Sequence, residues 1–267
     1  MAGVTGPSDL GADLDPLIAL LSEAGFVAAE EEARELSARA AGDVELLDAL
    51  VQRRLTGEPL AWITGRTPFC GMEVLVDPGV YVPRWQSEPL ARRAVERLPA
   101  TGTAVDLCTG SGAIAKVLSV ERPEALVVAT DLDQLAVACA TANGVAVSRG
   151  DLFDPLPSSL EGSVDVVVSV VPYVPTPQLA FLPHDTLAFE SSRSYDGGPD
   201  GMAILRRVVA GARRLLRPGG ALLLELGGEQ AGQLAPDLAR LGYVDIVMLF
   251  DEDGDARGIE ATAVPSG

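Results

Sequence analysis

The chain has 267 residues, with 38 Asp or Glu against 20 Lys or Arg and a net charge of −18. A field of that sign repels phosphate backbones and anionic membranes, so we expect neither as a partner. Three cysteines without metal-ligand spacing and a single histidine argue against a zinc site or a cysteine–histidine pair, and no metal is expected. No signal peptide is visible and no run reaches about 18 apolar residues, which favours a cytoplasmic location.

Residues 1–66 are predicted to form a small helical bundle. Asp15-Pro16 begins a first helix that ends at Gly25, a second covers residues 28–41, and Asp43 caps a third. A bundle of about fifty residues is marginally stable alone, so we expect it to lean on a larger domain.

Residues 67–84 are predicted to form a β-hairpin linker. Its strands would cover residues 67–76 and 81–82, with the turn at Asp77-Pro78-Gly79. A helix from Ser87 to Leu98 would then open the third part of the chain, residues 85–267.

From residue 103 onward, apolar strands and helices alternate. The predicted strands are 103–108, 125–131, 145–148, 164–170, 220–226, 243–250 and 258–264, and the predicted helices are 112–121, 133–142, 200–216 and 229–241. Alternation of this kind predicts a doubly wound, mostly parallel α/β sheet. The last two strands leave no room for a helix between them, so they should form an antiparallel hairpin. A parallel sheet with such an end is the arrangement of class I methyltransferases.

The stretch from Thr103 to Asp131 carries the predicted cofactor site. A strand leads into Cys108-Thr109-Gly110-Ser111-Gly112, a helix follows, and a second strand ends in Asp131. Gly110 and Gly112 allow a tight turn against which a ligand can lie, and the helix N-terminus presents unpaired N–H groups there. Asp131 follows Gly112 at the separation typical of a carboxylate that binds two ribose hydroxyls.

The glycine spacing alone fits both NAD and S-adenosylmethionine. Asp106 lies inside the strand just before the turn, where a charge is costly to bury unless it pairs with backbone N–H groups or a ligand cation. S-Adenosylmethionine carries an ammonium and a sulfonium, whereas Asp106 would repel a pyrophosphate. The residues therefore favour the methyl donor. The alternative is a βαβ unit whose glycines only let helix and strand pack closely.

Two more segments should reach the carboxyl ends of the strands, where ligands of such sheets bind. Asp151 could accept an amino hydrogen of adenine while Leu152 packs on the ring, or Asp151 could be a simple turn acid. The fourth strand runs into Val170-Val171-Pro172-Tyr173, near which the methyl acceptor should lie. Tyr173 could stack on a planar acceptor, close the cofactor pocket, or only cover the core.

The connection from Thr176 to Pro199 shows little regular pattern, and a loop of this length could act as a lid or substrate clamp. His184 within it is expected at the surface rather than as a base. Five arginines follow at helical spacing and are expected on a solvated face; they are Arg206, Arg207, Arg213, Arg214 and Arg217.

With these motifs together, the chain resembles the release-factor glutamine methyltransferase (HemK/PrmC) family over nearly all its length. The matching segments are Gly57-Glu-Pro-Leu60, Gly65, Phe69-x-Gly71, Val82-Pro-Arg84, Asp106 to Ala115, Asp131, Asp151, Asp196-Gly-Gly, Asp200-Gly201, Glu225, Gln230 and Asp251 to Arg257. The resemblance implies S-adenosylmethionine held by Cys108 to Gly112, Asp131 and the Asp151-Leu152 segment. It also implies methyl transfer to the side-chain amide nitrogen of a glutamine in a protein such as a translation release factor.

One segment departs from the family, which carries Asn-Pro-Pro-Tyr where this chain has Val170-Val171-Pro172-Tyr173. In the family the asparagine side chain and the next residue's carbonyl accept the two amide hydrogens. Val171 keeps its carbonyl, but Val170 has no side-chain acceptor, and an unpaired buried amide hydrogen costs about 1–3 kcal/mol. Misalignment would also cost rate. The segment Pro83-Arg-Trp-Gln-Ser-Glu88 is altered as well.

We therefore expect a divergent relative with an intact donor site and a changed acceptor site. Two alternatives stay open: methylation of another amide, an amine or a small metabolite, and a non-catalytic relative that only binds the cofactor. A nucleic-acid methyltransferase is the least favoured, because the chain is acidic and lacks a basic–aromatic patch.

Overall fold

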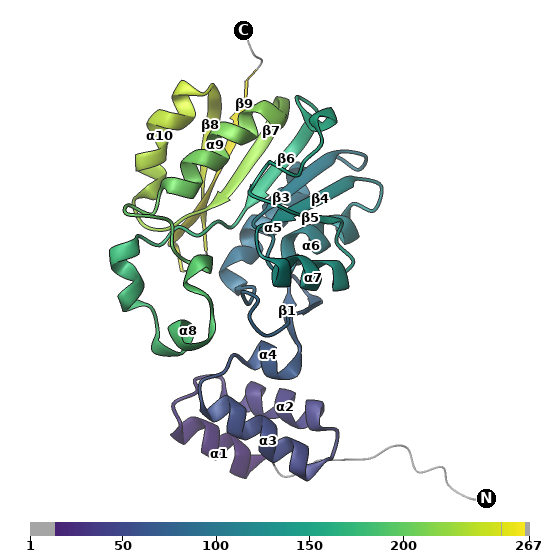
Figure 1. Ribbon diagram of the computed structural model, residues 1–267, viewed down its shortest axis with the longest axis vertical. Helices are drawn as coiled ribbons and strands as arrows, with labels where there is room; N and C mark the ends of the chain where they lie inside the picture. The colour runs from purple at the N-terminus through teal and green to yellow at the C-terminus, as the bar shows by residue number, and fades with distance from the viewer. Residues whose placement is uncertain (1–13, 252, 265–267) are drawn as a thin grey trace, which may run out of the picture. The chain divides into compact units, whose positions relative to one another are not determined.

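The computed structural model describes residues 14–251 and 253–264, and the chain divides into two compact units, residues 1–64 and 65–267 (Figure 1). The described part of the first unit contains four helices: α1 (Asp15–Glu23), α2 (Ala29–Ala40), α3 (Val44–Leu55) and α4 (Leu60–Thr64). Asp43 caps α3 as predicted, because its carboxylate accepts a hydrogen bond of 3.0 Å from the Leu46 amide. The short α4 was not predicted; Ile63 from it joins the core of this unit beside Leu36 and Leu50.

The second unit begins with a hairpin whose predicted turn was wrong. Strands β1 (Arg66–Phe69) and β2 (Met72–Leu75) pair antiparallel, so the turn is Cys70-Gly71 and residues 81–82 form no strand. Cys70 (φ 50°) and Gly71 (φ 75°) both adopt the left-handed conformation that a two-residue hairpin turn requires. The Cys70 amide also donates a hydrogen bond of 2.9 Å to Glu88, a tertiary contact that local sequence does not reveal.

The described part of the second unit holds a seven-stranded sheet in the order β5-β4-β3-β6-β7-β9-β8. The strands are β3 (Thr103–Leu107), β4 (Leu126–Asp131), β5 (Val147–Arg149), β6 (Val164–Ser169), β7 (Leu216–Glu225), β8 (Tyr243–Phe250) and β9 (Ala256–Ala263). Strands β3 to β7 pair in parallel, and β9 runs antiparallel to both of its neighbours. The predicted α/β fold class and the antiparallel end of the sheet are confirmed.

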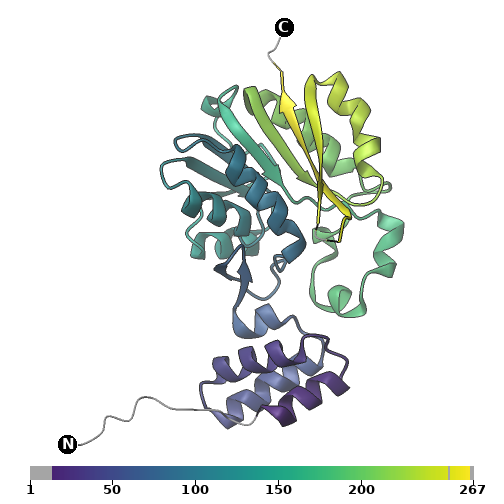
Figure 2. The ribbon, with the colours of Figure 1, turned by 180° about the vertical axis from the view of Figure 1, so that it is seen from behind.

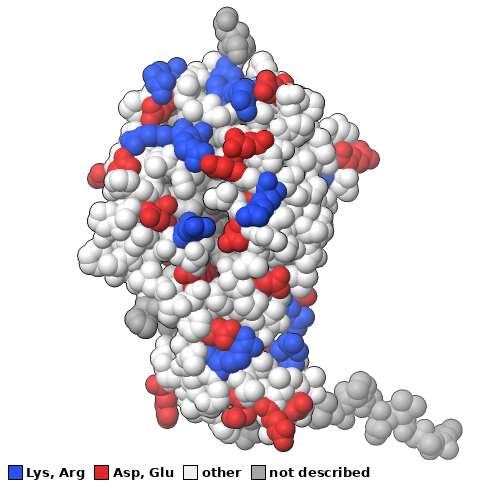
Figure 3. Space-filling view, in the orientation of Figure 1, with Lys and Arg blue, Asp and Glu red and all other residues white. Residues whose placement is uncertain are grey.

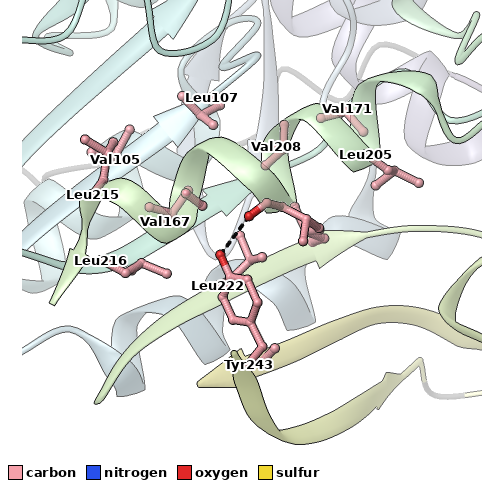
Figure 4. Packing of buried hydrophobic residues seen from close by; sticks show 14 of the residues in the cluster. Val105, Leu107, Val167, Val171, Leu205, Val208, Leu215, Leu216, Leu222 and Tyr243 are labelled. Atoms are coloured by element: carbon pink, nitrogen blue, oxygen red, sulfur yellow. Dashed lines mark hydrogen bonds between the residues drawn. The ribbon is translucent and has the colours of Figure 1, made fainter. Parts of the chain in front are cut away.

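Helices cover both faces of this sheet. They are α5 (Glu88–Arg97), α6 (Ala113–Glu121), α7 (Gln134–Ala142), α9 (Ala203–Leu215) and α10 (Gln230–Arg240). Figures 1 and 2 show α9 and α10 on one face and α5 on the other. The main core lies under α9, where Val167 and Leu222 of the sheet pack with Val208 (Figure 4). The Tyr243 hydroxyl is satisfied inside this core by a hydrogen bond of 2.9 Å to the Val209 carbonyl.

The long connection after β6 contains more structure than its sequence suggested. It includes a 3-10 helix (Thr176–Phe181), helix α8 (His184–Phe189) and a 3-10 turn (Ser192–Ser194). Both of its ends are tied together, because Val174 forms a parallel bridge with Asp196. Among the described residues, no helix is long and apolar enough to span a membrane.

Candidate cofactor and acceptor site

A pocket of about 420 Å³ lies in the second unit, beyond the carboxyl ends of β3, β4 and β6. It brings together nearly all the residues predicted for the site. Of the predicted residues, Gly112 does not line the pocket. Those that do are Asp106, Cys108, Thr109, Gly110, Ser111, Asp131, Asp151, Leu152, Val170, Val171, Pro172 and Tyr173. The donor motif and the acceptor loop therefore share one cavity.

The two glycines of the turn have different tasks. At Gly110 (φ 58°) no atom lies within 4 Å of the position a Cβ would take, and this residue faces the pocket. At Gly112 (φ 83°) a Cβ would lie 2.9 Å from Val145 and 3.0 Å from Ala140. The geometry therefore leaves room for a ligand at Gly110. At Gly112, where we also expected a ligand, the missing side chain instead lets the start of α6 pack closely against α7.

Asp106 is buried beneath the turn. Its carboxylate accepts hydrogen bonds from the Thr109 hydroxyl (2.6 Å) and the Ala115 amide (3.2 Å), the second at the start of α6. Burial nevertheless raises the pKa of Asp106 to about 7, because desolvation outweighs the opposing effect of these two donors; the charge of Asp131 adds a smaller upward shift. A ligand cation at this place would favour the ionised carboxylate.

Asp131 ends β4 and holds the turn in place. Its carboxylate accepts hydrogen bonds from the amides of Gly110 (2.8 Å) and Asp133 (2.9 Å). Burial raises the pKa of Asp131, and the two amides oppose that shift. A carboxylate oxygen can accept more than one hydrogen bond, so the same group can also receive hydroxyls from a ligand in the pocket.

Ser111 supplies the clearest sign that this turn is built for a ligand. Its side chain is buried, and within residues 14–251 and 253–264 its Oγ is the buried side-chain nitrogen or oxygen that has no hydrogen-bond partner. Buried polar atoms are normally satisfied, so an orphaned hydroxyl in a pocket wall fits an absent polar ligand. The backbone beneath it is fixed, since the Asn143 amide donates to the Ser111 carbonyl at 2.9 Å.

Asp151 and Leu152 form the next wall. Leu152 adopts a left-handed conformation (φ 50°), and its carbonyl accepts a hydrogen bond of 2.7 Å from Thr130. Asp151 pairs with Arg207 at 2.8 Å, and both side chains are about half exposed, at 44% and 55%. Arg207 therefore lines the pocket together with Ile204, one turn earlier on α9.

Arg207 is exposed, as expected for the solvated arginine face, and it also lines the pocket, which was not predicted. The spacing of Ile204 and Arg207 on a predicted helix was a signal that could have found it. Three of the other four arginines pair with nearby acids, Arg206 with Asp200, Arg214 with Glu161 and Arg217 with Asp165, while Arg213 donates to the carbonyls of Leu241 and Val264.

The acceptor loop is held in place by core packing of Val171 and by hydrogen bonds of Tyr173. Val171 is only 2% exposed and belongs to the core, where Figure 4 shows it close to Leu205. The Tyr173 hydroxyl donates to Glu225 at 3.2 Å, and its carbonyl accepts a hydrogen bond of 2.8 Å from Gln230. Burial, followed by the charge of Glu225, raises the pKa of Tyr173, so its hydroxyl stays protonated. The Tyr173 ring is thereby held in one orientation.

Two further tyrosines face the same end of the pocket and were missed by the sequence interpretation. The rings of Tyr81 and Tyr195 meet edge to face with centroids 5.6 Å apart. Behind them the buried Glu190 accepts hydrogen bonds from the Val82 amide, from Arg84 and from the Tyr195 hydroxyl. Three of the four tyrosines of the chain line this pocket, but only the tertiary fold brings them together.

No protein-family model matches the chain. The chain is 36% identical to the release factor glutamine methyltransferase of Geobacter sulfurreducens, over 78% of this chain and 74% of that protein. It is 39% identical to the enzyme of the same name from Moorella thermoacetica, over 71% and 69% of the two chains. For the one from Mycolicibacterium smegmatis the identity is 33%, over 94% and 96%.

The chain belongs to the release factor glutamine methyltransferase family. Membership confirms the resemblance stated from the motifs, the methyltransferase class and S-adenosylmethionine as the cofactor. The site fits this cofactor, because Ser111 leaves an orphaned hydroxyl and Gly110 an open cradle beside Asp106.

Solved structures support the fold of the family member. A methyltransferase from Pyrococcus furiosus, 19% identical, superposes with a TM-score of 0.52 over 73% of this chain and 91% of that one. The hMettl16 catalytic domain, 13% identical, gives a TM-score of 0.57 over 73% and 77%. At these identities the likeness concerns the fold alone.

Proposed function

We propose that this protein transfers the methyl group of S-adenosylmethionine to the side-chain amide nitrogen of a glutamine in a protein, with a translation release factor as the first candidate. The observation that carries the proposal is the pocket itself, which joins the donor turn to the loop of Val170 to Tyr173. Relatives that match 71–94% of the chain are named for this activity.

The chain's own residues divide the task of holding the donor. The bound cofactor supplies a methyl group on a positively charged sulfur. Asp106 would hold its ammonium, because a buried carboxylate with a raised pKa gains most from a cation. Asp131 would accept the ribose hydroxyls, and the Ser111 hydroxyl would pair with a polar atom of the amino-acid part.

The adenine end of the donor would lie between two walls. Leu152 and Ile204 offer apolar side chains to the ring faces, and Asp151 offers a carboxylate to the amino group. Because Asp151 already pairs with Arg207, its carboxylate is held in place before the ligand arrives. Gly110 and the helix start at Ala113 complete the cradle.

The acceptor loop can orient an amide with one main-chain oxygen. The carbonyls of Val171 and Pro172 accept no hydrogen bond from the described residues, so Val171 can receive one amide hydrogen. Val170 offers only methyl groups to the second hydrogen, at a cost of about 1–3 kcal/mol. We infer a glutamine site that works with one hydrogen bond fewer.

A second candidate is methylation of a different amide, an amine or a small metabolite. The apolar pair Val170 and Val171 favours it. A nucleophilic nitrogen with only one hydrogen would not need the second hydrogen-bond acceptor that Val170 does not provide. A third possibility, a relative that binds the cofactor without turnover, follows from the same substitution.

Incubation with S-adenosylmethionine labelled in its methyl group and with purified release factors tests the proposal. We expect label in the release factor, mapped by mass spectrometry to one glutamine, and none with the Asp131→Ala variant. Donor binding without transfer to any glutamine-containing protein would refute the acceptor half. Label on a small molecule from a metabolite extract would support the second candidate.

A further inference from the structure

Asn143 is the one asparagine of the chain, and it is buried directly after α7. The helix ends there because Gly144 adopts a left-handed conformation (φ 82°). Two backbone hydrogen bonds close this turn: the Gly144 amide donates to the Thr141 carbonyl at 2.9 Å, and the Val145 amide donates to the Ala140 carbonyl at 3.0 Å. The turn leaves the Asn143 side chain inside the unit, where its two donor and two acceptor positions need partners.

All of these positions are occupied. The Nδ2 group of Asn143 donates to the Leu75 carbonyl at 2.8 Å and to the Ser111 carbonyl at 2.9 Å. Its Oδ1 atom accepts from the Leu75 amide at 2.9 Å and from Lys116 at 3.2 Å. The Leu75 amide requires an oxygen and the two carbonyls require a nitrogen, so these partners fix the orientation of the side-chain amide. Asn143 therefore links the last residue of β2 to the donor turn.

Lys116, the one lysine of the chain, adds a second link from α6. Most arginines of the chain pair with Asp or Glu, and Figure 3 shows the two signs of charge side by side on one face. Lys116 instead donates to two uncharged oxygens, the Glu73 carbonyl at 2.7 Å and the Asn143 Oδ1 atom. The helix that follows the donor turn is thus attached to β2 as well.

The hydrogen bond from Asn143 takes the place of a helical one at Ser111. In an α-helix the carbonyl of residue 111 would accept from the amide of residue 115. The Ala115 amide instead donates to the Asp106 carboxylate at 3.2 Å, and the Ser111 carbonyl accepts from the Asn143 side chain. This contact fixes the peptide group that follows Ser111, the residue whose buried hydroxyl has no partner among the described residues.

We propose that Asn143 is a positioning residue of the donor site, which holds the Ser111 carbonyl so that the Ser111 hydroxyl meets a polar atom of the amino-acid part of S-adenosylmethionine. This inference rests on the role given to Ser111 in the proposed function. A hydrogen bond weakens steeply when its donor and acceptor are misaligned. Loss of Asn143 should therefore weaken ligands that carry the amino-acid part and spare ligands that lack it.

The test compares two ligands by calorimetric titration: S-adenosylmethionine and 5′-methylthioadenosine, which keeps the adenosine and the sulfur but lacks the amino-acid part. We expect Asn143→Leu to weaken binding of S-adenosylmethionine about tenfold and binding of 5′-methylthioadenosine less than about twofold. Asn143→Asp keeps the acceptors for Leu75 and Lys116 but loses the donor to Ser111, and should show the same selective loss. Ser111→Ala should show it too, and adding Asn143→Asp to Ser111→Ala should cause no further loss of selectivity.

Two variants control for a general loss of stability. Lys116→Met removes one neighbour of Asn143 but leaves the contact between Asn143 and Ser111. Tyr243→Phe removes a buried hydrogen bond to a backbone carbonyl, and Tyr243 does not line the pocket. Both should lower the free energy of unfolding, and both should keep the wild-type preference for S-adenosylmethionine over 5′-methylthioadenosine.

Equal weakening of both ligands in the Asn143 variants, or no weakening of either, would overturn the inference. So would selectivity losses that add up in the double variant, or a selective loss with Lys116→Met as large as that with Asn143→Leu. Methyl transfer to a glutamine peptide is recorded separately. Selective loss of S-adenosylmethionine binding in a protein that methylates no glutamine would reject the proposed function and leave the role of Asn143 standing.

Discussion

The donor end of the pocket is formed largely by one continuous unit, residues 103–131, whereas the acceptor end collects segments that begin at Tyr81 and reach Glu225. At the donor end Asp106 and Asp131 already accept amide or hydroxyl hydrogen bonds, and among the described residues the buried side-chain atom without a partner is the Ser111 hydroxyl. At the acceptor end an asparagine expected from the family is replaced by Val170. The comparison teaches that a binding site can keep one half and change the other, because the two halves share few residues.

The largest effect should come from Asp131→Ala. The change removes the group that fixes the Gly110 amide and would receive two ribose hydroxyls, each a charge-assisted hydrogen bond. We expect S-adenosylmethionine affinity to fall about 1,000-fold in calorimetric titration. Asp154→Ala, an exposed acid three residues after Asp151, is the control and should change nothing. A small loss for Asp131→Ala would mean that the donor end has been misassigned.

Alanine substitutions at the two glycines of the turn should have different effects on the free energy of unfolding and on donor binding. Gly112→Ala forces a Cβ to within 2.9 Å of Val145 in a left-handed conformation, so we expect the free energy of unfolding to fall by about 2–4 kcal/mol. Gly110→Ala meets no atom within 4 Å and should lose about 1–2 kcal/mol, while its methyl group enters the donor cradle. Chemical denaturation and donor titration on both variants check this. Equal stability losses would contradict the assignment.

Donor binding should depend on pH through Asp106. Burial raises the pKa of Asp106 to about 7, so without ligand the group keeps a proton that the unfolded chain would release near pH 4. The contribution of Asp106 to the free energy of unfolding of the ligand-free protein therefore decreases as pH rises from about 4 towards 7. An ammonium favours the ionised carboxylate, so donor affinity should rise about tenfold between pH 6 and 8. Asp106→Asn should flatten that dependence, and an unchanged slope in this variant would exclude Asp106 as its cause.

The fold was predictable where its signals are local. The alternation after residue 103 gave every strand of the large sheet to within a few residues, because buried parallel strands are apolar runs separated by helices. The hairpin turn was misplaced because Cys70 adopts a left-handed conformation, which a cysteine in the sequence does not predict. Helix α4 was missed because it is only five residues long, too short to show a helical repeat of apolar residues.

The site was predictable to the same extent. The donor residues lie within one strand–turn–helix–strand unit, so their spacing was visible in the sequence. Tyr81, Tyr195 and Arg193 reach the pocket only through the long connection and the segment after the hairpin. The contact of the exposed Arg207 with Asp151 was not predicted, because the two residues lie 56 positions apart in the sequence.

The most direct test of the account is the Val170→Asn variant, assayed for donor affinity and for methyl transfer to a glutamine peptide. The account predicts unchanged S-adenosylmethionine affinity and transfer that is about tenfold faster, because the second amide hydrogen gains an acceptor. Val174→Asn, which places the same group elsewhere in the pocket wall, should not raise the rate. A Val170→Asn variant whose donor affinity changes, or whose transfer is no faster than that of the wild type, would contradict an intact donor end beside an altered acceptor end.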